Sequence, residues 1–435
     1  MTQTSKISAP IVVVGGGLAG LTAAVILGRA GRRVVLYEKA KALGGRAQTQ
    51  GRAGYRFNIG PHALYRGGAA RRIFAEMGLS FAGAAPRPAG GFAVSGGRKH
   101  ALPGGFVSLL TTSLLRLPGK IELARLMGTL PKLRPSAAEG LTLRQWTEQQ
   151  LRQPNVRALV QALARLSTYT NAPDRLSASV ALEQLQLALS QNVDYLDGGW
   201  QVMVDALRHA ADAAGVRVES GRRVVAVEHD DALRGVRLAD GETAAAEAVI
   251  LAMAPDEAAE LMPGSASLRA WAQAALPIQA ACLDLALSSL PQPRATFALG
   301  IDAPLYLSVH SAVAKLAPQG GALIHVAKYL DPTTASAAKD DEAELERLMD
   351  LVQSGWRQVV VDRRFLPSMT VSHALVEAKR GFAGRPGPAV PGIAGVLVAG
   401  DWVGSQGLLL DASIASAKQA AERLLAAAPA QAAAA

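Results

Sequence analysis

Cysteine is nearly absent from this sequence. Cys282 is the only one in 435 residues, so a disulfide within the chain and a metal site built from several cysteines are both excluded. We expect Cys282 to be a small core residue, and we predict no metal site. A single cysteine also suits the reducing conditions of the cytoplasm, where we expect the protein to be located.

Charged and aromatic residues are also few. Charged residues make up 18% of the chain and hydrophobic ones 50%, which leaves apolar surface to line a pocket or to contact an apolar partner. The 45 Lys and Arg residues outnumber the 35 Asp and Glu residues, and the formal net charge of +10 can attract anionic cofactors, membranes or nucleic acid. Because aromatic residues are only 5% and no motif for reading bases is present, we do not expect nucleic acid as a partner.

One uncharged stretch, residues 11–28, is just long enough to be considered as a membrane span or a signal peptide. Four glycines lie in its middle, however, and each would weaken a continuous helix. The β-branched residues 11–14 and the helical spacing of the apolar residues after them predict a strand, a tight turn and a helix instead. Residues 34–38 are predicted as the next strand, which makes a unit typical of a parallel sheet.

Gly15, Gly17 and Gly20 have the spacing G-x-G-x-x-G between this predicted strand and helix. Gly15 permits the turn, Gly17 lets the backbone approach a pyrophosphate, and Gly20 lets the helix pack closely on the strand. The start of the helix offers free N–H groups and a positive dipole to the anion. Glu38, at the end of the next predicted strand, would bind the ribose hydroxyls and disfavour a 2′-phosphate. The pattern predicts a dinucleotide site.

The segment Leu43-Gly44-Gly45-Arg46 follows, and this order resembles the FAD fingerprint of the amine oxidase and phytoene desaturase superfamily. The resemblance implies FAD as the cofactor, and Arg46 would meet its pyrophosphate or flavin edge unless it is a solvated loop arginine. We expect non-covalent attachment, because Cys282 is far from the C-terminal motif where a relative's linking cysteine would lie. In this part of the chain the implied cofactor contacts are Gly15, Gly17, Leu18, Ala19, Gly20, Glu38, Lys39, Gly45 and Arg46.

Two middle segments extend the resemblance. Residues 54–62 look like the family's segment beneath the isoalloxazine, which would bring Gly60, Pro61 and His62 to the cofactor. His62 could equally be a turn histidine bonded to backbone. Residues 198–227 resemble the segment in which a strand edge holds the adenine through backbone hydrogen bonds, with Val225 marking the position.

Near the C-terminus, residues 397–401 match the second FAD motif, in which the aspartate is directed toward the ribityl and phosphate region. A closing helix follows, whose start can point its dipole at the flavin. Asp411 departs from the glutamate or glycine that many relatives carry, and it could also be the N-cap of that helix. The implied cofactor contacts here are Gly400, Asp401, Leu409 and Leu410.

The reaction itself places few demands on the side chains. Because the flavin accepts a hydride, the protein mainly has to hold a C–H bond against it. Lys328 resembles in rough position the lysine that some amine oxidases hold near the flavin, although an exposed lysine at a strand end is an alternative. Trp402 is a candidate wall near the flavin or a core residue. With His62, these are the candidate catalytic residues.

Residues 98–134 carry seven Lys or Arg residues and one acid, Glu122, interleaved with large apolar side chains. Such a stretch can lie on an anionic membrane surface, so a peripheral membrane contact is one interpretation. A solvated face of a helix packed into the substrate domain is the other.

These features predict an α/β fold, in which a Rossmann-like FAD-binding domain is interleaved with an α+β substrate domain. We assign residues 1–97, 198–265 and 381–435 to the FAD-binding domain. The substrate domain then comprises residues 98–197, a helical insert, and 266–380, a mixed sheet with strands expected near 282–287, 305–310 and 322–328.

The predicted function is that of an FAD-dependent oxidoreductase. It would abstract hydride from a hydrophobic or amine substrate, turning C–C into C=C or C–N into C=N, with oxygen or another acceptor taking the electrons. Two alternatives stay open: a flavin-dependent isomerase of polyene double bonds that works without net redox change, and a lipid-binding escort protein on the same fold. Complete FAD motifs argue against the escort protein.

Overall fold

The N-terminal strand, turn and helix open a five-stranded sheet whose pairings are all parallel. In the computed structural model, which describes residues 9–86, 91–230 and 232–427, the strand order is β10-β2-β1-β14-β20. This confirms the predicted α/β fold, and it shows that residues 11–28 are not one continuous helix. The strands are β1 (Ile11–Val14), β2 (Val34–Glu38), β10 (Arg217–Ser220), β14 (Ala248–Leu251) and β20 (Val396–Val398).

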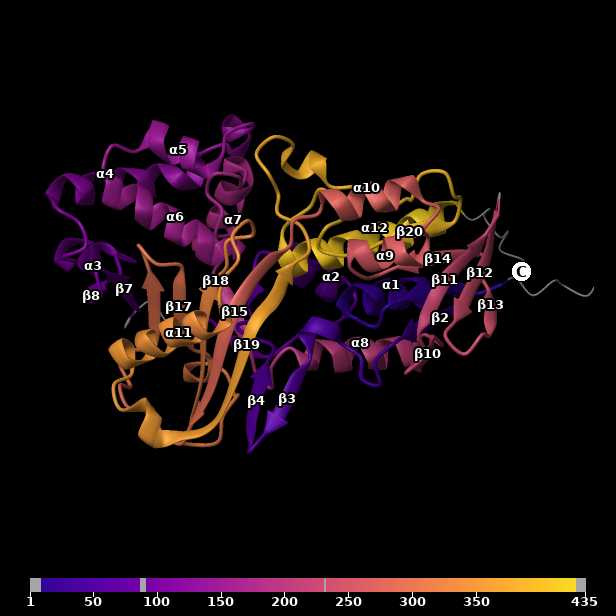
Figure 1. The fold of residues 1–435 in the computed structure, drawn as a ribbon, viewed down its shortest axis with the longest axis horizontal. Coiled ribbons are helices and arrows are strands. Elements are labelled where there is room, and N and C mark those ends of the chain that lie inside the picture. The colour runs from indigo at the N-terminus through magenta and orange to yellow at the C-terminus, as the bar shows by residue number, and fades with distance from the viewer. Residues whose placement is uncertain (1–8, 87–90, 231, 428–435) are drawn as a thin grey trace, which may run out of the picture.

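Both faces of this sheet are covered (Figure 1). Alternate residues of β1 enter two separate cores, with Ile11 and Val13 facing one and Val12 and Val14 the other. The first core is closed by α1 (Leu18–Arg29), α2 (Ala69–Glu76), α8 (Gln201–Ala213) and α12 (Leu409–Ala427). The second is closed by β11 (Val224–His229), β12 (Leu233–Leu238), β13 (Thr243–Ala245), α9 (Pro255–Leu261) and α10 (Ala266–Ala274).

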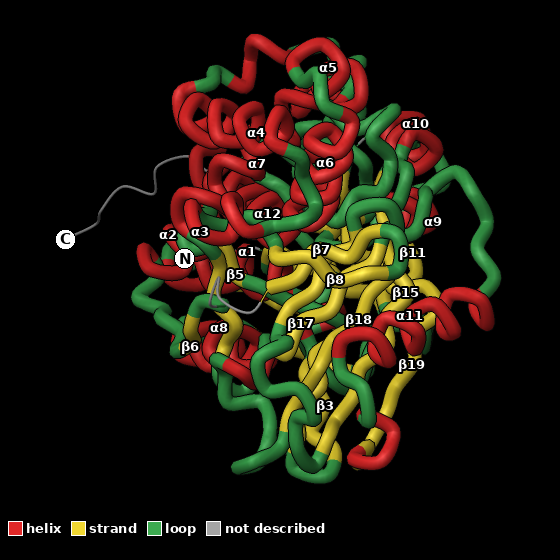
Figure 2. Tube along the Cα trace, turned by 90° about the vertical axis from the view of Figure 1, so that its left-hand side faces the viewer, coloured by secondary structure: helices red, strands yellow, loops and turns green. Residues whose placement is uncertain are grey.

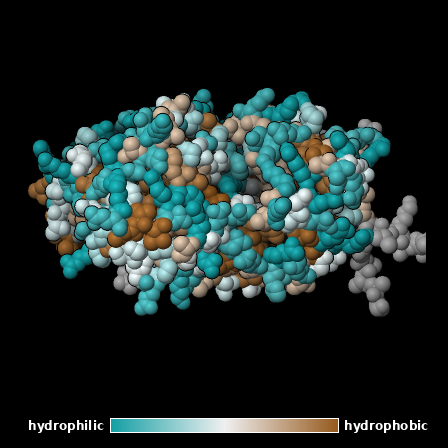
Figure 3. Space-filling model, turned by 60° about the horizontal axis from the view of Figure 1, so that its bottom comes forward, coloured by the Kyte–Doolittle hydropathy of each residue, from teal (hydrophilic) through white to brown (hydrophobic). Residues whose placement is uncertain are grey.

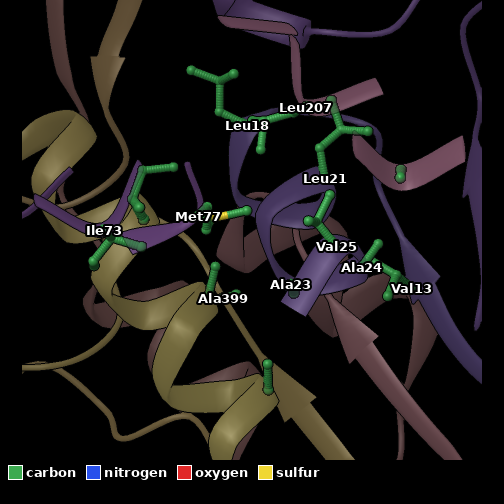
Figure 4. Close-up of a cluster of buried hydrophobic side chains, with 14 of the residues drawn as sticks. Val13, Leu18, Leu21, Ala23, Ala24, Val25, Ile73, Met77, Leu207 and Ala399 are labelled. Carbon is green, nitrogen blue, oxygen red and sulfur yellow. The ribbon is translucent and has the colours of Figure 1, made fainter. Parts of the chain in front are cut away.

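Small side chains on α1 let its neighbours come close. Figure 4 shows Ala23 and Ala24 on this helix beside larger residues such as Leu21 and Val25 in the first core. Short side chains allow α12 to pack closely along α1. The start of α12 is thereby brought to the same end of the sheet as the glycine turn.

A seven-stranded mixed sheet forms the centre of the second domain, in the order β19-β15-β18-β17-β16-β7-β8. Helix α11 (Ala338–Val352) packs on one face of it. The strands are β7 (Gly91–Ser95), β8 (Arg98–Ala101), β15 (Ile278–Leu287), β16 (Phe297–Gly300), β17 (Leu305–Val309), β18 (Ala322–Tyr329) and β19 (Val360–Ser372). Short strands elsewhere are β3 (Thr49–Arg52), β4 (Tyr55–Asn58), β5 (Leu64–Tyr65), β6 (Gly83–Ala84) and β9 (Val193–Leu196).

Five helices, α3 to α7, lie between residues 106 and 191. Figure 2 shows α4, α5, α6 and α7 gathered above the strands of the second sheet. Trp146 and Val156 bury apolar side chains among these helices, and Leu299 of β16 joins the same cluster. The helices are α3 (Phe106–Thr111), α4 (Leu117–Thr129), α5 (Leu143–Gln150), α6 (Pro154–Thr168) and α7 (Ala178–Gln191). None of the helices within the described ranges is both long and apolar enough to span a bilayer.

The longest strand, β19, was not predicted. Its sequence includes Asp362, Arg363, Arg364 and Pro367, which break the apolar alternation expected of a strand. The proline is tolerated because β19 is an edge strand and because the register with β15 shifts between Cys282 and Ala280, where Pro367 lies. This strand matters for function, because its C-terminal part reaches the cavity described next.

Candidate cofactor and substrate cavity

The glycine turn between β1 and α1 is fixed by backbone contacts at two positions and leaves open space at a third. Gly15 has φ +109°, and a Cβ there would lie 2.4 Å from the carbonyl oxygen of Ala252. A Cβ on Gly20 would lie 1.9 Å from the carbonyl oxygen of Gly15. A Cβ on Gly17 would meet no atom within 4 Å. The fold therefore requires glycine at 15 and 20, whereas Gly17 leaves room for a ligand.

The first turn of α1 is suited to an anion. Gly17 is its N-cap residue and makes no side-chain cap, and the turn carries no acidic residue. The backbone N–H groups of this first turn are therefore free to bind an anion, and the positive end of the helix dipole lies there. Together with the open space at Gly17, this is the form of a pyrophosphate site, and it fits the dinucleotide that the motif predicts.

Glu38 ends β2, and two backbone amides hold its carboxylate. The Gly16 N–H donates to Oε2 at 2.6 Å, and the Ala40 N–H donates to Oε1 at 2.7 Å. Each oxygen has a second lone pair, and the side chain lines the cavity. Glu38 thus ties the glycine turn to β2 while remaining able to accept hydrogen bonds from a ligand. Beside it, the Lys39 Nζ lies 2.5 Å from Oε1 of Glu257 on α9.

Most of the predicted cofactor residues line one cavity. Its volume of about 560 Å³ is within the range usual for small-molecule and cofactor sites. Both domains line it. The predicted residues in its wall are Gly15, Gly17, Leu18, Ala19, Glu38, Lys39, Gly45, Arg46, Pro61, His62, Gly400, Asp401, Leu409 and Leu410. Gly20, Gly60 and Val225 do not belong to the wall, although each is adjacent in the sequence to a residue that does.

Val225 lies at a β-bulge. The register of β11 with β12 shifts between Val224 and Ala226, so Val225 is left out of the ladder. Its neighbour Val224 lines the cavity. This end of the cavity also contains residues that the sequence did not single out: Arg222, Arg223, Glu257, Glu260 and Leu261.

An ion pair joins the two predicted FAD motifs. A guanidinium nitrogen of Arg46 lies 2.8 Å from Oδ2 of Asp401, and another donates to the carbonyl of Val371 on β19 at 2.7 Å. His373 approaches Oδ1 of Asp401 with its backbone N–H and its ring Nδ1. Burial acts to raise the pKa of Asp401, but Arg46 and His373 outweigh it and hold that pKa below its usual range. Asp401 is therefore a buried anion that orients Arg46.

The start of α12 lines the cavity, and its first residue has an unusual backbone conformation. Leu409 has φ +55°, which is uncommon for a leucine, and it lines the cavity with Leu410 and Asp411. Oδ1 of Asp411 accepts the Ala70 N–H at 2.8 Å, so Asp411 caps the neighbouring helix α2. The prediction that it caps its own helix is wrong, because Asp411 already lies in the first turn of α12. Burial raises the pKa of Asp411 to about 6.

His62 presents its ring to the cavity. Its Nδ1 lies 3.0 Å from the carbonyl oxygen of Gly60, which assigns the N–H to Nδ1 and leaves Nε2 as the acceptor. The ring lies edge-on to Trp200, with 4.3 Å between the ring centroids. Burial lowers the pKa of His62 to about 4, so the imidazole is neutral near pH 7. The turn interaction and the cavity position, offered as alternatives, coexist.

Behind His62 lies a buried charged cluster that the sequence did not reveal. The His325 Nδ1 lies 2.6 Å from Oδ1 of Asp284, and Arg364 lies 2.6 Å from Oδ2. Burial acts to raise the pKa of Asp284, but His325 and the Arg364 guanidinium outweigh it and hold that pKa low. The His310 ring packs edge-on to His325 and stacks on Tyr195. A carboxylate and a histidine within apolar strand segments are the signal that could have identified it.

The two other candidate catalytic residues lie away from the cavity wall. Lys328 is on the face of β18 opposite to His325, where its Nζ pairs with Asp341 at 2.8 Å and Glu344 at 3.0 Å on α11. Trp402 is buried in the second core of the cofactor domain, and its indole N–H donates to the carbonyl of Met253 at 2.9 Å. The prediction that Cys282 is a core residue is confirmed, since it is fully buried.

The end of the cavity near His62 is mainly apolar and aromatic. Tyr169 follows α6 directly and its hydroxyl donates to the carbonyl of Pro61 at 3.1 Å. The remaining wall residues on this side include Tyr65, Met369, Thr370 and Val371. No group of His, Cys, Asp or Glu residues placed to hold a metal ion occurs among the described residues.

The family described as flavin containing amine oxidoreductase matches residues 18–279, more than half of the chain. A phytoene desaturase from Cercospora nicotianae is 42% identical over 80 residues, which are 18% of this chain and 13% of that protein. A carotenoid 3,4-desaturase from Haloarcula japonica is 44% identical over 68 residues, 16% of this chain and 14% of the relative. The chain thus matches only a small part of the length of these relatives.

Solved structures share the whole fold at low identity. An oxidoreductase from Methanosarcina mazei superposes with a TM-score of 0.77 at 19% identity, covering 96% of this chain and 100% of the other. Putrescine oxidase bound to putrescine gives 0.74 at 14% identity, covering 97% and 99%. A Rab GDI from Plasmodium falciparum gives 0.62 at 13% identity, covering 96% and 98%. At these identities the likeness shows the fold alone.

Proposed function

The chain belongs to the flavin-containing amine oxidoreductases and is therefore an FAD-dependent oxidoreductase; we propose that it removes hydride from a neutral, apolar substrate, turning a carbon–carbon single bond into a double bond. The observation that carries this proposal is the chemistry of the cavity, where the two aspartates of the wall, Asp401 and Asp411, already have partners. Asp401 is paired with Arg46, and Asp411 caps α2.

Burying a cationic amine in a cavity costs free energy unless a carboxylate is available to pair with it. The wall near His62 offers tyrosines, a methionine and aliphatic side chains instead. The short matches to carotenoid desaturases point in the same direction. An uncharged hydrocarbon substrate therefore agrees better with this wall than an amine does.

Within the proposal, FAD supplies the hydride acceptor when bound, and the chain's own residues bind and orient it. The amides at the start of α1 would hold its pyrophosphate, and Glu38 would accept its ribose hydroxyls. Arg46, held by Asp401, adds a fixed positive charge in the same cavity. The first turn of α12 adds its helix dipole to this positive region.

Desaturation also releases a proton, and we assign its removal to His62. The substrate loses a hydride from one carbon and a proton from the next, so the two electrons leave with the hydride. Nε2 is the unprotonated nitrogen of the His62 ring, and His62 lines the cavity, so this nitrogen would accept that proton. Its low pKa keeps it unprotonated before the reaction. Oxygen or another acceptor then takes the electrons.

The test is a visible spectrum of the purified protein followed by anaerobic mixing with candidate polyenes and amines. A desaturase bleaches the flavin stoichiometrically with an apolar polyene. Bleaching by amines alone would overturn the substrate class, and conversion of a polyene with no change in the flavin spectrum would reveal the redox-neutral isomerase. A colourless protein that gains no flavin absorbance on FAD addition would favour the escort alternative.

The role of His62 has a separate test. In His62→Asn the side-chain nitrogen can still donate to the Gly60 carbonyl, but the base is lost. We expect FAD to bind normally and the rate of flavin bleaching to fall about 100-fold or more. Lys328→Gln is the control, since Lys328 pairs with α11 away from the cavity wall, and it should keep the rate. Equal rates in the wild type and His62→Asn would remove His62 from the chemistry.

A further inference from the structure

Large apolar side chains on the surface are concentrated in one short segment. Seven large apolar side chains are strongly exposed among the described residues. Five of them lie on α3 and the first turns of α4, with 45–76% of their surface exposed. They are Phe106, Val107, Leu110, Leu117 and Ile121, and we call them the α3–α4 patch. The other two, Leu189 and Val361, lie on α7 and β19. Single exposed apolar residues are ordinary, whereas a contiguous group marks a contact surface.

The charge around the patch is positive and uncompensated. Arg116 precedes α4 directly, and Lys120 and Arg125 follow on that helix. None of the seven Lys and Arg residues between 98 and 134 takes part in an ion pair with any described residue. Elsewhere most ion pairs of the molecule use arginine with a neighbouring carboxylate. The patch therefore combines exposed apolar side chains with available cations.

The one acid of this stretch is unavailable to those cations. The Glu122 carboxylate accepts the backbone amides of Arg152 at 2.7 Å and Gln153 at 2.9 Å, the residues directly before α6. Its negative charge is thus directed to the start of α6, where the helix dipole is positive. The Lys120 amine donates to the carbonyl of Leu110, which joins the end of α3 to α4. The patch is a fixed surface that includes both helices.

We propose that the α3–α4 patch docks this protein peripherally on an anionic lipid bilayer. Apolar side chains would enter the boundary of the acyl chains, and Arg116, Lys120 and Arg125 would meet the acidic headgroups. A second copy of the chain is a poorer occupant, because a symmetric contact would place the same unpaired cations opposite one another. Hydrophobic atoms interrupt the hydrophilic surface at the left-hand end of Figure 3, the end at which α3 lies in Figure 1.

The position of the patch suits an enzyme with an apolar substrate. Glu122 of α4 holds the start of α6, and Tyr169, directly after α6, lines the cavity. One helix of 15 residues, roughly 22 Å long, therefore connects the bilayer-facing surface to the cavity wall. The docking proposal goes beyond the proposed reaction, because vesicle binding requires no turnover, and it can fail or hold independently.

The experiment is co-sedimentation of the FAD-loaded protein with vesicles of phosphatidylcholine alone or mixed with phosphatidylserine. We expect binding to the mixed vesicles only, weakened by added salt. Phe106→Gln with Leu117→Gln should lower the partition constant at least about tenfold, because each side chain contributes a large buried apolar area. Leu189→Gln with Val361→Thr is the control, since it replaces the two strongly exposed apolar side chains outside the patch, and it should bind as the wild type does.

A charge series completes the test. Arg116→Gln with Arg125→Gln should lower the partition constant about tenfold or more, whereas Lys339→Gln with Lys379→Gln, which removes the same charge elsewhere, should have little effect. FAD absorbance and melting temperature should match the wild type in every variant. Absence of wild-type binding, or patch variants that bind like the wild type, would overturn the proposal. So would a dimer in light scattering that the Phe106 and Leu117 changes dissociate.

Discussion

The region around the five-stranded parallel sheet and the seven-stranded mixed sheet arrange their polar groups in opposite ways. At the glycine turn, backbone amides would meet the proposed ligand, and the absence of a side chain matters at Gly15, Gly17 and Gly20. In the second sheet, the charged side chains of Asp284, His325 and Arg364 are buried against one another. The first arrangement depends on space and backbone shape, and the second on mutual neutralisation. Substitutions should therefore fail in different ways in the two domains.

Gly20→Ala should have the largest effect. Its Cβ would meet the Gly15 carbonyl at 1.9 Å, and backbone cannot move aside as a flexible side chain can. We expect the free energy of unfolding to fall by more than about 4 kcal/mol, or no folded protein at all. Gly17→Ala is the contrast: its Cβ meets nothing, so stability should change by less than about 1 kcal/mol while FAD affinity falls about tenfold or more. Equal destabilisation by both would contradict the distinction.

Asp284→Asn tests the opposite arrangement. It leaves Arg364 buried without its counter-ion, and we expect the free energy of unfolding to fall by about 3–5 kcal/mol in chemical denaturation. FAD affinity should change little in the protein that remains folded, because Asp284 does not line the cavity. Asp350→Asn breaks the solvent-exposed pair with Arg357 and serves as the control with a small effect. A loss of FAD without a loss of stability would show that the cluster belongs to the cofactor site.

Asp411 lies in the cavity wall at the start of α12, and its pKa makes the stability of the protein depend on pH. Burial raises that pKa from 3.8 to about 6. The contribution of Asp411 to stability is therefore complete below about pH 4 and is lost as the pH rises through 6. Asp411→Asn should gain stability relative to the wild type over this range, by about 2–3 kcal/mol at pH 8. A difference independent of pH, in melts from pH 4 to 8, would count against it.

Glu38→Ala should have the smallest effect. The change removes hydrogen bonds from the Gly16 and Ala40 amides, which water can reach in part, and the acceptor for the ribose. We expect FAD affinity to fall about tenfold, or about 1.4 kcal/mol, with modest change in stability. Titration of the flavin absorbance measures it. Unchanged affinity would remove Glu38 from the cofactor site.

Residues close together in the chain were the predictable part of this molecule. The strand, turn and helix around Gly15, and the strand that ends at Glu38, follow from local spacing and were predicted correctly. Strand β19 was not predicted, because Pro367 and the charged residues of the strand break the alternation of apolar and polar residues that was used to identify strands. An edge strand tolerates such residues. Arg46 and Asp401 were each predicted within a motif, but the ion pair between them was not, since the two residues are far apart in the chain.

By itself, then, the sequence determined the dinucleotide turn, the order of the FAD motifs and the α/β fold, because backbone geometry at glycine and the period of a strand or helix are encoded over a few residues. The tertiary structure alone decided that Asp284, His325 and Arg364 would meet, and that His62 but not Lys328 would face the cavity. It also decided that the α3–α4 patch would remain uncovered. Those outcomes depend on which strands are neighbours and which face of each is buried, and strand order is set by packing across the whole chain.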